Sequence, residues 1–236
     1  MINYLLNLPS YLFRKFRSKK TSYSLTSIDL LVSHIFKNQN KGVFIDVGCN
    51  HPIYNNNTYL LYKKGWRGIN IDLDKKSIDL FNLFRKYDYN QNIAVSSKFE
   101  DTELYFYHDK SPINTINKKT ADFQNAQYKE IKTIKTQILD SIITNSPFVD
   151  KKIDFLSIDV EGHELEVLKG FDFKKYSPKI IVIEYLDLSL NKLEIINFNL
   201  QNVLSSPLYQ YVIDNNYTLV NWIHSDLVFV SNNYRD

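Results

Sequence analysis

Residues 153–164 have the sequence IDFLSIDVEGHE, and this stretch indicates the type of fold most clearly. Residues 153–159 form a short, mostly apolar run, which is typical of a strand buried on both faces of a sheet. A turn at Glu161-Gly162 follows, and a helical pattern then runs from about His163 to Gly170. A strand that leads directly into a helix is the repeating unit of a parallel sheet, because parallel strands need a crossover connection.

Similar units lie on both sides of this stretch. Asn57 is expected to begin a helix that Gly65 ends, and Ser77 begins another with Ile78 and Phe84 facing inward. These alternations predict an α/β fold: a mostly parallel, Rossmann-like sheet covered on both faces, with a C-terminal antiparallel hairpin. The remaining predicted strands are 43–47, 68–72, 92–95, 179–184, 217–223 and 226–230, and 102–107 and 130–138 are also expected to be extended.

Size and composition fit one such domain. The chain has 236 residues, of which 44% are hydrophobic and 23% charged, enough for a full core. Its net charge of +3 is too small to indicate a nucleic-acid partner. The basic character is concentrated in residues 1–40, where six Lys and Arg residues face one acid, Asp29. We therefore expect residues 1–40 to form a basic extension, with a helix over 27–37, and residues 41–236 to form the main domain.

Other features bear on location in the cell. Cys49 is the only cysteine, which excludes an intramolecular disulfide and fits a reducing cytosol. No apolar run reaches the ~18 residues of a membrane-spanning helix. Residues 4–16 form an amphipathic segment interrupted at Pro9, which either caps the core or rests its basic face on anionic lipid or an acidic partner. We expect a cytoplasmic protein, with peripheral membrane contact through the N-terminus left open.

Carboxylates gather where the predicted strands end. Asp72, Asp159 and Glu184 each close a strand, and Asp46 lies one residue inside the end of the first strand. In an open parallel sheet the carboxyl ends of the strands form the ligand-binding edge. The sequence therefore predicts a polar cleft at this edge.

The loop after the first strand indicates a nucleoside cofactor without phosphates. Gly48 allows a tight turn and a close approach of the backbone to a ligand. The dinucleotide pattern G-x-G-x-x-G is not met, because Asn50 and Ile53 occupy its later glycine places. Asp72, at the end of the second strand, can accept hydrogen bonds from both hydroxyls of a ribose. Its other interpretation is a turn or capping residue before Lys75.

Three acids and an imidazole lie within six residues at 159–164. Asp159, Glu161 and His163 could activate a hydroxyl as general bases. Asp159 and Glu161 could instead hold a divalent metal ion such as Mg²⁺ together with Glu184, since all three offer oxygen ligands. Acids at the start of a helix also act as plain caps, because the helix dipole favours them there.

The same residues carry a resemblance to a known family. Residues 44–50, FIDVGCN, resemble the D-V-G-A-N start of FkbM-type methyltransferases. Residues 56–72 look like the next block of that family, and 153–164 are similar to its most diagnostic stretch. The resemblance covers roughly residues 40–190. The chain departs from the family pattern at two places. Cys49 replaces the usual alanine, and the His51-Pro52 step replaces a glycine-rich continuation that many members have.

The resemblance implies a class I methyltransferase fold, with residues 41–236 as the methyltransferase domain. It implies S-adenosylmethionine as donor and a hydroxyl as acceptor, on a sugar of a glycan, glycolipid or secondary metabolite. It also implies roles for single residues. Asp46, Gly48 and Asn50 would line the methionine side, Asp72 the ribose, Asn92 and Ala94 the adenine, and Asp159, Glu161 and His163 the acceptor.

Three other classes remain as alternatives. An NAD-linked enzyme would use Asp72 in the same way, but the missing glycines count against it. A metal-dependent hydrolase would use the acids at 159–164 and Glu184, but would leave Asp72 and the Asp46-x-Gly48 loop unexplained. A non-catalytic binding module would keep the cofactor cleft but would lack residues able to activate an acceptor. The polar stretch 108–129 is expected to be a long functional or mobile loop in each case.

Overall fold

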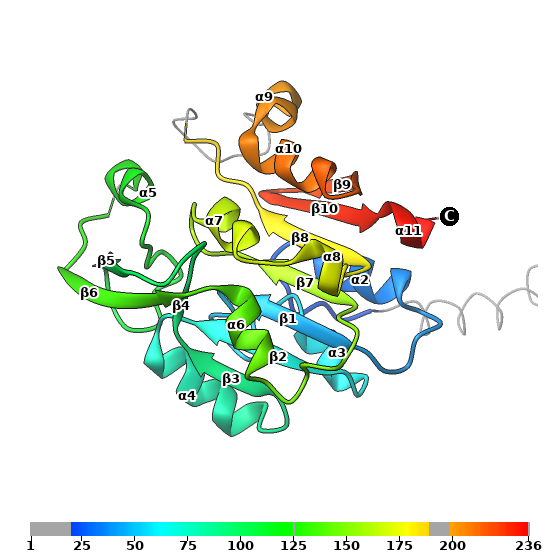
Figure 1. Ribbon diagram of the computed structural model, residues 1–236. Coiled ribbons are helices and arrows are strands. Elements are labelled where there is room, and N and C mark those ends of the chain that lie inside the picture. The colour runs from blue at the N-terminus through cyan, green and yellow to red at the C-terminus, as the bar shows by residue number, and fades with distance from the viewer. Residues whose placement is uncertain (1–19, 125, 189–198, 236) are drawn as a thin grey trace, which may run out of the picture.

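The computed structural model describes residues 20–124, 126–188 and 199–235, arranged as an α/β fold around a seven-stranded sheet (Figure 1). The strands are β1 Val43–Val47, β2 Arg67–Asp72, β3 Tyr89–Asn92, β4 Ala94–Val95, β5 Asp101–Phe106, β6 Glu130–Gln137, β7 Phe155–Ile158, β8 Ile180–Glu184, β9 Tyr217–Ile223 and β10 Asp226–Ser231. The helices are α2 Ile28–Ile35, α3 Tyr59–Lys63, α4 Lys75–Phe84, α5 Lys118–Phe123, α6 Leu139–Thr144, α7 Glu164–Lys169, α8 Phe173–Tyr176, α9 Leu200–Ser205, α10 Pro207–Asp214 and α11 Asn232–Arg235.

The large sheet has the strand order β3-β2-β1-β7-β8-β10-β9. Its first five strands are parallel, and Ile45 in β1 pairs with Ile69 on one side and Leu156 on the other. β10 runs antiparallel to both β8 and β9. The predicted Rossmann-like sheet with a C-terminal antiparallel hairpin is therefore confirmed.

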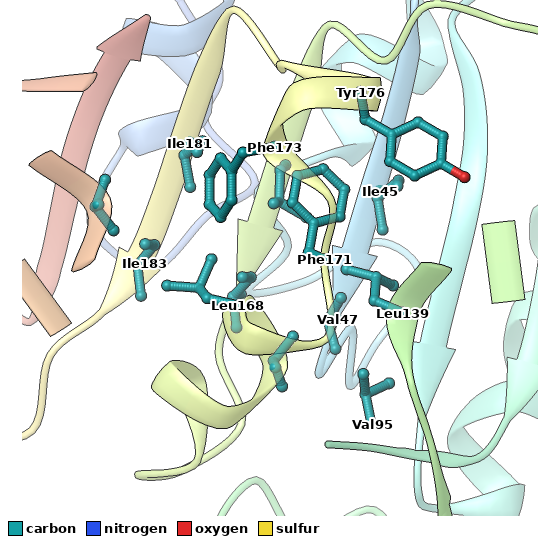
Figure 2. Packing of buried hydrophobic residues seen from close by; sticks show 14 of the residues in the cluster. Ile45, Val47, Val95, Leu139, Leu168, Phe171, Phe173, Tyr176, Ile181 and Ile183 are labelled. Atoms are coloured by element: carbon teal, nitrogen blue, oxygen red, sulfur yellow. The ribbon is translucent and has the colours of Figure 1, made fainter. Parts of the chain in front are cut away.

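Side chains alternate between two buried faces of this sheet, as the pleat of a strand requires. Ile45, Val47 and Ile181 belong to the larger core, which α6, α7, α8 and α10 cover; Figure 2 shows Phe171 and Phe173 packed within it. Phe44 faces the opposite way, into a second core that α2 and α3 cover. Apolar runs such as Val43–Val47 were readable as strands because both faces are buried.

Helix α2 is part of this folded unit. Ile28 and Val32 are fully buried against Phe44 and Trp66, and Phe36 is nearly so. In the first turn of the helix, the buried carboxylate of Asp29 accepts hydrogen bonds from the Ser22 hydroxyl and other groups of residues 22–24. The fold therefore begins before the expected boundary at residue 41. The amphipathic segment over residues 4–16 lies outside the described residues.

The third predicted strand is divided between two sheets. Of the predicted residues 92–95, Asn92 ends β3, which pairs with β2, while Ala94 and Val95 turn away and pair with Thr136 and Gln137 of β6. Residues 89–91 also belong to β3 and were not expected to form a strand. β6 also pairs with β5, and these strands and α5 lie at the carboxyl ends of the large sheet (Figure 1). The long loop of residues 108–129 thus contains a short helix, α5.

Smaller details of the helices differ from expectation. Thr58, not Asn57, precedes α3, and the Asn57 amide instead donates a hydrogen bond to Ser157 Oγ at 3.2 Å. α4 begins two residues before Ser77, because Asp74 caps it through its side chain. Phe84, expected to face inward, is 50% exposed at the end of that helix. In the described part of the chain, no helix has the length and apolar character needed to cross a bilayer.

Candidate active site

A cavity of about 450 Å³ opens at the carboxyl ends of the parallel strands. It lies where strand order reverses: β2 and β3 extend from one side of β1, and β7 and β8 from the other. Such a switch point is the usual ligand site of an open α/β sheet. Among the predicted site residues, those that line it are Gly48, Asn50, Asp72, Ala94, Asp159, Glu161, His163 and Glu184.

One half of the cavity is built on the loop after β1 and on Asp72. Gly48 has a φ of +80°, and a side chain there would strike the carbonyl of Asp159, so only glycine fits. The backbone N–H of Asn50 donates to Asp72 Oδ2 at 2.8 Å, and that of Asp74 donates to Asp72 Oδ1 at 2.7 Å. Withdrawal from water raises the pKa of Asp72 to about 6 despite these bonds. Apolar side chains from β2 and β4, including Ile71 and Val95, continue the wall.

Two residues expected beside the cofactor lie outside the cavity wall. Asp46 is buried one residue before the strand end, so its side chain points into the protein. Its Oδ2 accepts hydrogen bonds from Thr58 Oγ1 at 2.8 Å and Asn56 Nδ2 at 3.0 Å. Asn92 is exposed, and its amide folds back to donate to the Asp72 carbonyl at 3.0 Å. Asp46 and Asn92 therefore shape the loop and the strand end without facing the cavity.

A buried arginine behind the β1 loop was not predicted from the sequence. Arg85 is fully buried, and its Nε pairs with Asp88 Oδ2 at 2.9 Å. Its Nη1 donates to Thr58 Oγ1 at 2.9 Å and to Asn56 Oδ1 at 3.2 Å. Through these two residues Arg85 is linked to Asp46 and so braces the loop that carries Gly48. Its burial depends on contacts far apart in the sequence, which no local pattern reveals.

The other half of the cavity is strongly acidic. Carboxylate oxygens of Asp159, Glu161 and Glu184 lie within 4.8 Å of one another. Loss of hydration, with nearby acids, raises the pKa of Asp159 to about 7 and that of Glu161 to about 9. The same causes raise the pKa of Glu184 well above its usual range. This cluster therefore retains a proton near neutral pH unless a cation replaces it.

Asp226 joins this acidic side from the start of β10. It lines the cavity, and its Oδ2 accepts a hydrogen bond from Thr26 Oγ1 at 3.1 Å. Leu25 lines the same wall and is 74% exposed. Residues near both ends of the described chain thus complete the cavity, a contribution that sequence patterns did not indicate. Among the described residues, no lysine or arginine lines this cavity.

The three acids fit a divalent cation. All their ligand atoms are oxygens, the type that Mg²⁺ and Ca²⁺ prefer. Glu184 Oε2 is shielded from solvent and makes no hydrogen bond to the described part of the protein. A buried acceptor without a donor is costly, so a cation or a protonated neighbour would stabilise it.

His163 lies apart from this set. It lines the cavity, but its Nε2 is 3.0 Å from Ser96 Oγ, on the segment that follows β4. Burial lowers the pKa of His163, so the imidazole is neutral at neutral pH. A neutral ring can accept a proton, which is what a general base requires. The structure thus brings the three acids together and places His163 nearby on the same cavity.

Comparison with known proteins agrees with this geometry. A family model described as the methyltransferase FkbM domain matches residues 46–209. The match runs from the end of β1 into α10 and contains each of the predicted site residues. No protein with a curated description matches the chain significantly. Since the match covers well over half of the chain, this protein belongs to the FkbM methyltransferase family.

Proposed function

We propose that this methyltransferase takes its methyl group from S-adenosylmethionine and transfers it to a hydroxyl, on a sugar of a glycan, glycolipid or secondary metabolite. One observation carries the proposal. Asp72, an acid placed as in proteins that bind a ribose, lines the same cavity as the acidic cluster around Asp159. No lysine or arginine of the described chain lines that cavity. A pyrophosphate cofactor such as NAD would meet several carboxylates and no balancing cation, whereas a sulfonium donor carries no phosphate and is itself positive.

The residues present fit that donor. The ionised carboxylate of Asp72 can accept hydrogen bonds from ribose hydroxyls. Ile71, Ala94 and Val95 offer an apolar wall for the adenine ring, and Gly48 and Asn50 present backbone close to the methionine portion. The donor supplies an activated methyl group on sulfur, so the protein has only to align the acceptor hydroxyl and make it more nucleophilic.

Two candidates for activating the hydroxyl lie on the acidic side. His163 can accept its proton as a neutral imidazole. Alternatively, Asp159, Glu161 and Glu184 would hold Mg²⁺, which polarises a bound hydroxyl and lowers its pKa. The gathering of the three acids within 4.8 Å favours the second candidate, and the lowered pKa of His163 favours the first.

Calorimetric titration tests the proposal. The protein should bind S-adenosylmethionine and its demethylated product, S-adenosylhomocysteine, and should not bind NAD. Asp72→Asn should weaken binding by about 1–3 kcal/mol, because a ribose hydroxyl then loses its charged acceptor. Asp79→Asn is the matched control, since Asp79 is an exposed acid on α4 that pairs with the exposed Lys75. Binding of NAD without binding of either sulfur compound would refute the proposal.

The acceptor can be found by comparing host glycans with and without the protein. Mass spectrometry should show one sugar that loses a methyl group when the protein is absent. An unchanged set of glycans, glycolipids and small glycosides would rule out the sugar class while leaving donor binding as a separate result.

A further inference from the structure

The loop between β5 and α5 packs directly on the turn that carries Glu161. Its residues alternate in direction: Asn114 and Ile116 line the cavity, while Thr115 and Asn117 face the turn. The Thr115 hydroxyl donates to the Glu161 carbonyl at 2.8 Å, and the Asn117 amide donates to the Gly162 carbonyl. One segment therefore forms part of the cavity wall and holds the acidic turn.

This turn needs external support because its backbone is strained. Glu161 has a φ of +57°, a left-handed conformation that is unfavourable for a residue with a side chain. Such strain persists only where surrounding contacts enforce it, and it concentrates at functional sites. From inside the protein, Glu164 Oε1 accepts from the N–H groups of Val160 at 3.1 Å and Gly162 at 2.9 Å. Thr115 and Asn117 bond carbonyl groups of the same turn.

The two loop residues are themselves well fixed. Thr115 is fully buried, and its backbone pairs with Tyr105 of β5. Its Oγ1 also accepts a hydrogen bond from the Asn117 N–H at 2.9 Å. The approach is close, because a side chain on Gly162 would collide with Thr120 Oγ1. The acidic turn is thus held by a segment that is itself bridged to β5 and caps α5.

We propose that Thr115 and Asn117 are positioning residues, which fix the turn of residues 159–163 so that Glu161 and His163 face the reacting hydroxyl. The identity of that reaction rests on the function proposed above, but the positioning does not. Neither residue has to touch substrate. They act through the backbone of Glu161 and Gly162.

Paired substitutions separate positioning from general stability. Thr115→Val keeps the shape of the side chain and removes the hydroxyl, while Thr115→Ser keeps the hydroxyl. Asn117→Asp keeps the Oδ1 that caps α5 through Lys119 and Thr120, but it can no longer donate to the Gly162 carbonyl. Thr133→Val is the control, on an exposed residue of β6.

The imidazole NMR signals report the position of the turn without any ligand. The chain has five histidines, and the His163 signal is assigned by its loss in His163→Gln. Thr115→Val and Asn117→Asp should shift the His163 signal and leave those of His34 and His224 unchanged. Thr115→Ser and Thr133→Val should shift none of them. If both variants fold and the His163 signal stays in place in each, the proposal is overturned. If Thr115→Val does not fold, the His163 signal of Asn117→Asp alone decides the outcome.

Binding and turnover complete the test. S-adenosylhomocysteine affinity, measured by calorimetry, should be unchanged in Thr115→Val and Asn117→Asp. Turnover of the acceptor found in the glycan comparison should fall on the order of 10²-fold, at unchanged KM for the donor, as expected when reacting groups are misplaced. Turnover equal to wild type would overturn the proposal. If wild-type protein binds no donor, the proposed function fails, while a shifted His163 signal still supports the positioning.

Discussion

Asp72 is the residue whose charge should control donor binding most directly. Its two oxygens already accept hydrogen bonds from the N–H groups of Asn50 and Asp74, which aim the carboxylate at the cavity. Its pKa is raised to about 6, because burial disfavours the charged form. The ionised form is acceptor-only, whereas the protonated form gives up part of its capacity to accept from a ribose.

We therefore expect S-adenosylhomocysteine to bind progressively more weakly as the pH falls through about 6. Above that pH the carboxylate is charged and affinity should reach a plateau. Titrations at several pH values on both sides of this point measure the effect. Asp72→Asn, which cannot ionise, should show a flat profile. A wild-type profile equally flat would mean that Asp72 does not contact the ligand.

The choice between His163 and a cation can be settled by two variants and a chelator. If His163 is the base, His163→Ala should lower turnover about 10²–10⁴-fold with donor affinity nearly unchanged. Turnover of the wild type should then increase as the pH rises through the lowered pKa of His163, since only the neutral ring accepts a proton. If a cation acts instead, chelation should abolish turnover, and Asp159→Ala should remove cation binding in a calorimetric titration with Mg²⁺. Wild-type turnover in both variants would leave the acidic cluster with a structural role.

Single residues show where sequence reasoning succeeds and where it stops. Acids at the strand ends were predictable, because a strand that ends at Asp72 or Asp159 fixes where that side chain lies. The direction of the Asp46 side chain was not predictable, since it depends on which face of β1 packs against which helices. Arg85 and Thr115 were missed because their partners lie far along the chain, at Asn56 and Glu161.

At the scale of elements, α2 offers the clearest measurement. Ile28 is fully buried in the core that this helix shares with Phe44. Ile28→Ala should lower the free energy of unfolding by roughly 2–5 kcal/mol, through lost burial and the cavity left behind. Leu83→Ala, on a residue of α4 that is 68% exposed, is the control and should change it by less than about 0.5 kcal/mol. Urea denaturation measures both, and equal effects would show that α2 is an accessory segment.

Long apolar elements were predicted better than short or divided ones. The four parallel strands β1, β2, β7 and β8 were recognised, because both of their faces are buried and their apolar runs are continuous. β3 was missed except for its last residue, because its sequence is polar and it is only half-buried. Residues 92–95 read as one strand but serve two sheets, a division set by pairing with Thr136 and Gln137. The short helices α6, α8, α9 and α10 escaped recognition, although α2, α3 and α7 are equally short and were expected. Helices of four to eight residues carry only a weak periodic signal, so their recognition depends on capping and turn residues beside them.

At the scale of the molecule, the fold class and the position of the cleft could be predicted from the sequence. The residues that complete the wall of the cleft could not. The carboxyl ends of parallel strands meet at one edge whatever the details of packing. The remaining wall comes from Thr26 near the start of the described chain and Asp226 near its end. Contacts between residues so far apart in the sequence depend on how the folded sheet brings these two segments together.

The strand order β8-β10-β9 also has a consequence for synthesis. β10 leaves the ribosome after β9, yet it lies between β8 and β9 and not at the edge of the sheet. Until it emerges, the nascent chain exposes β8 as an open edge rich in isoleucine, the kind of edge that recruits other chains. A premature stop codon before residue 226 would therefore yield an aggregation-prone fragment, one that also lacks Asp226 from the cavity wall. Translation must therefore pass residue 226 before the wall of this cavity can be complete.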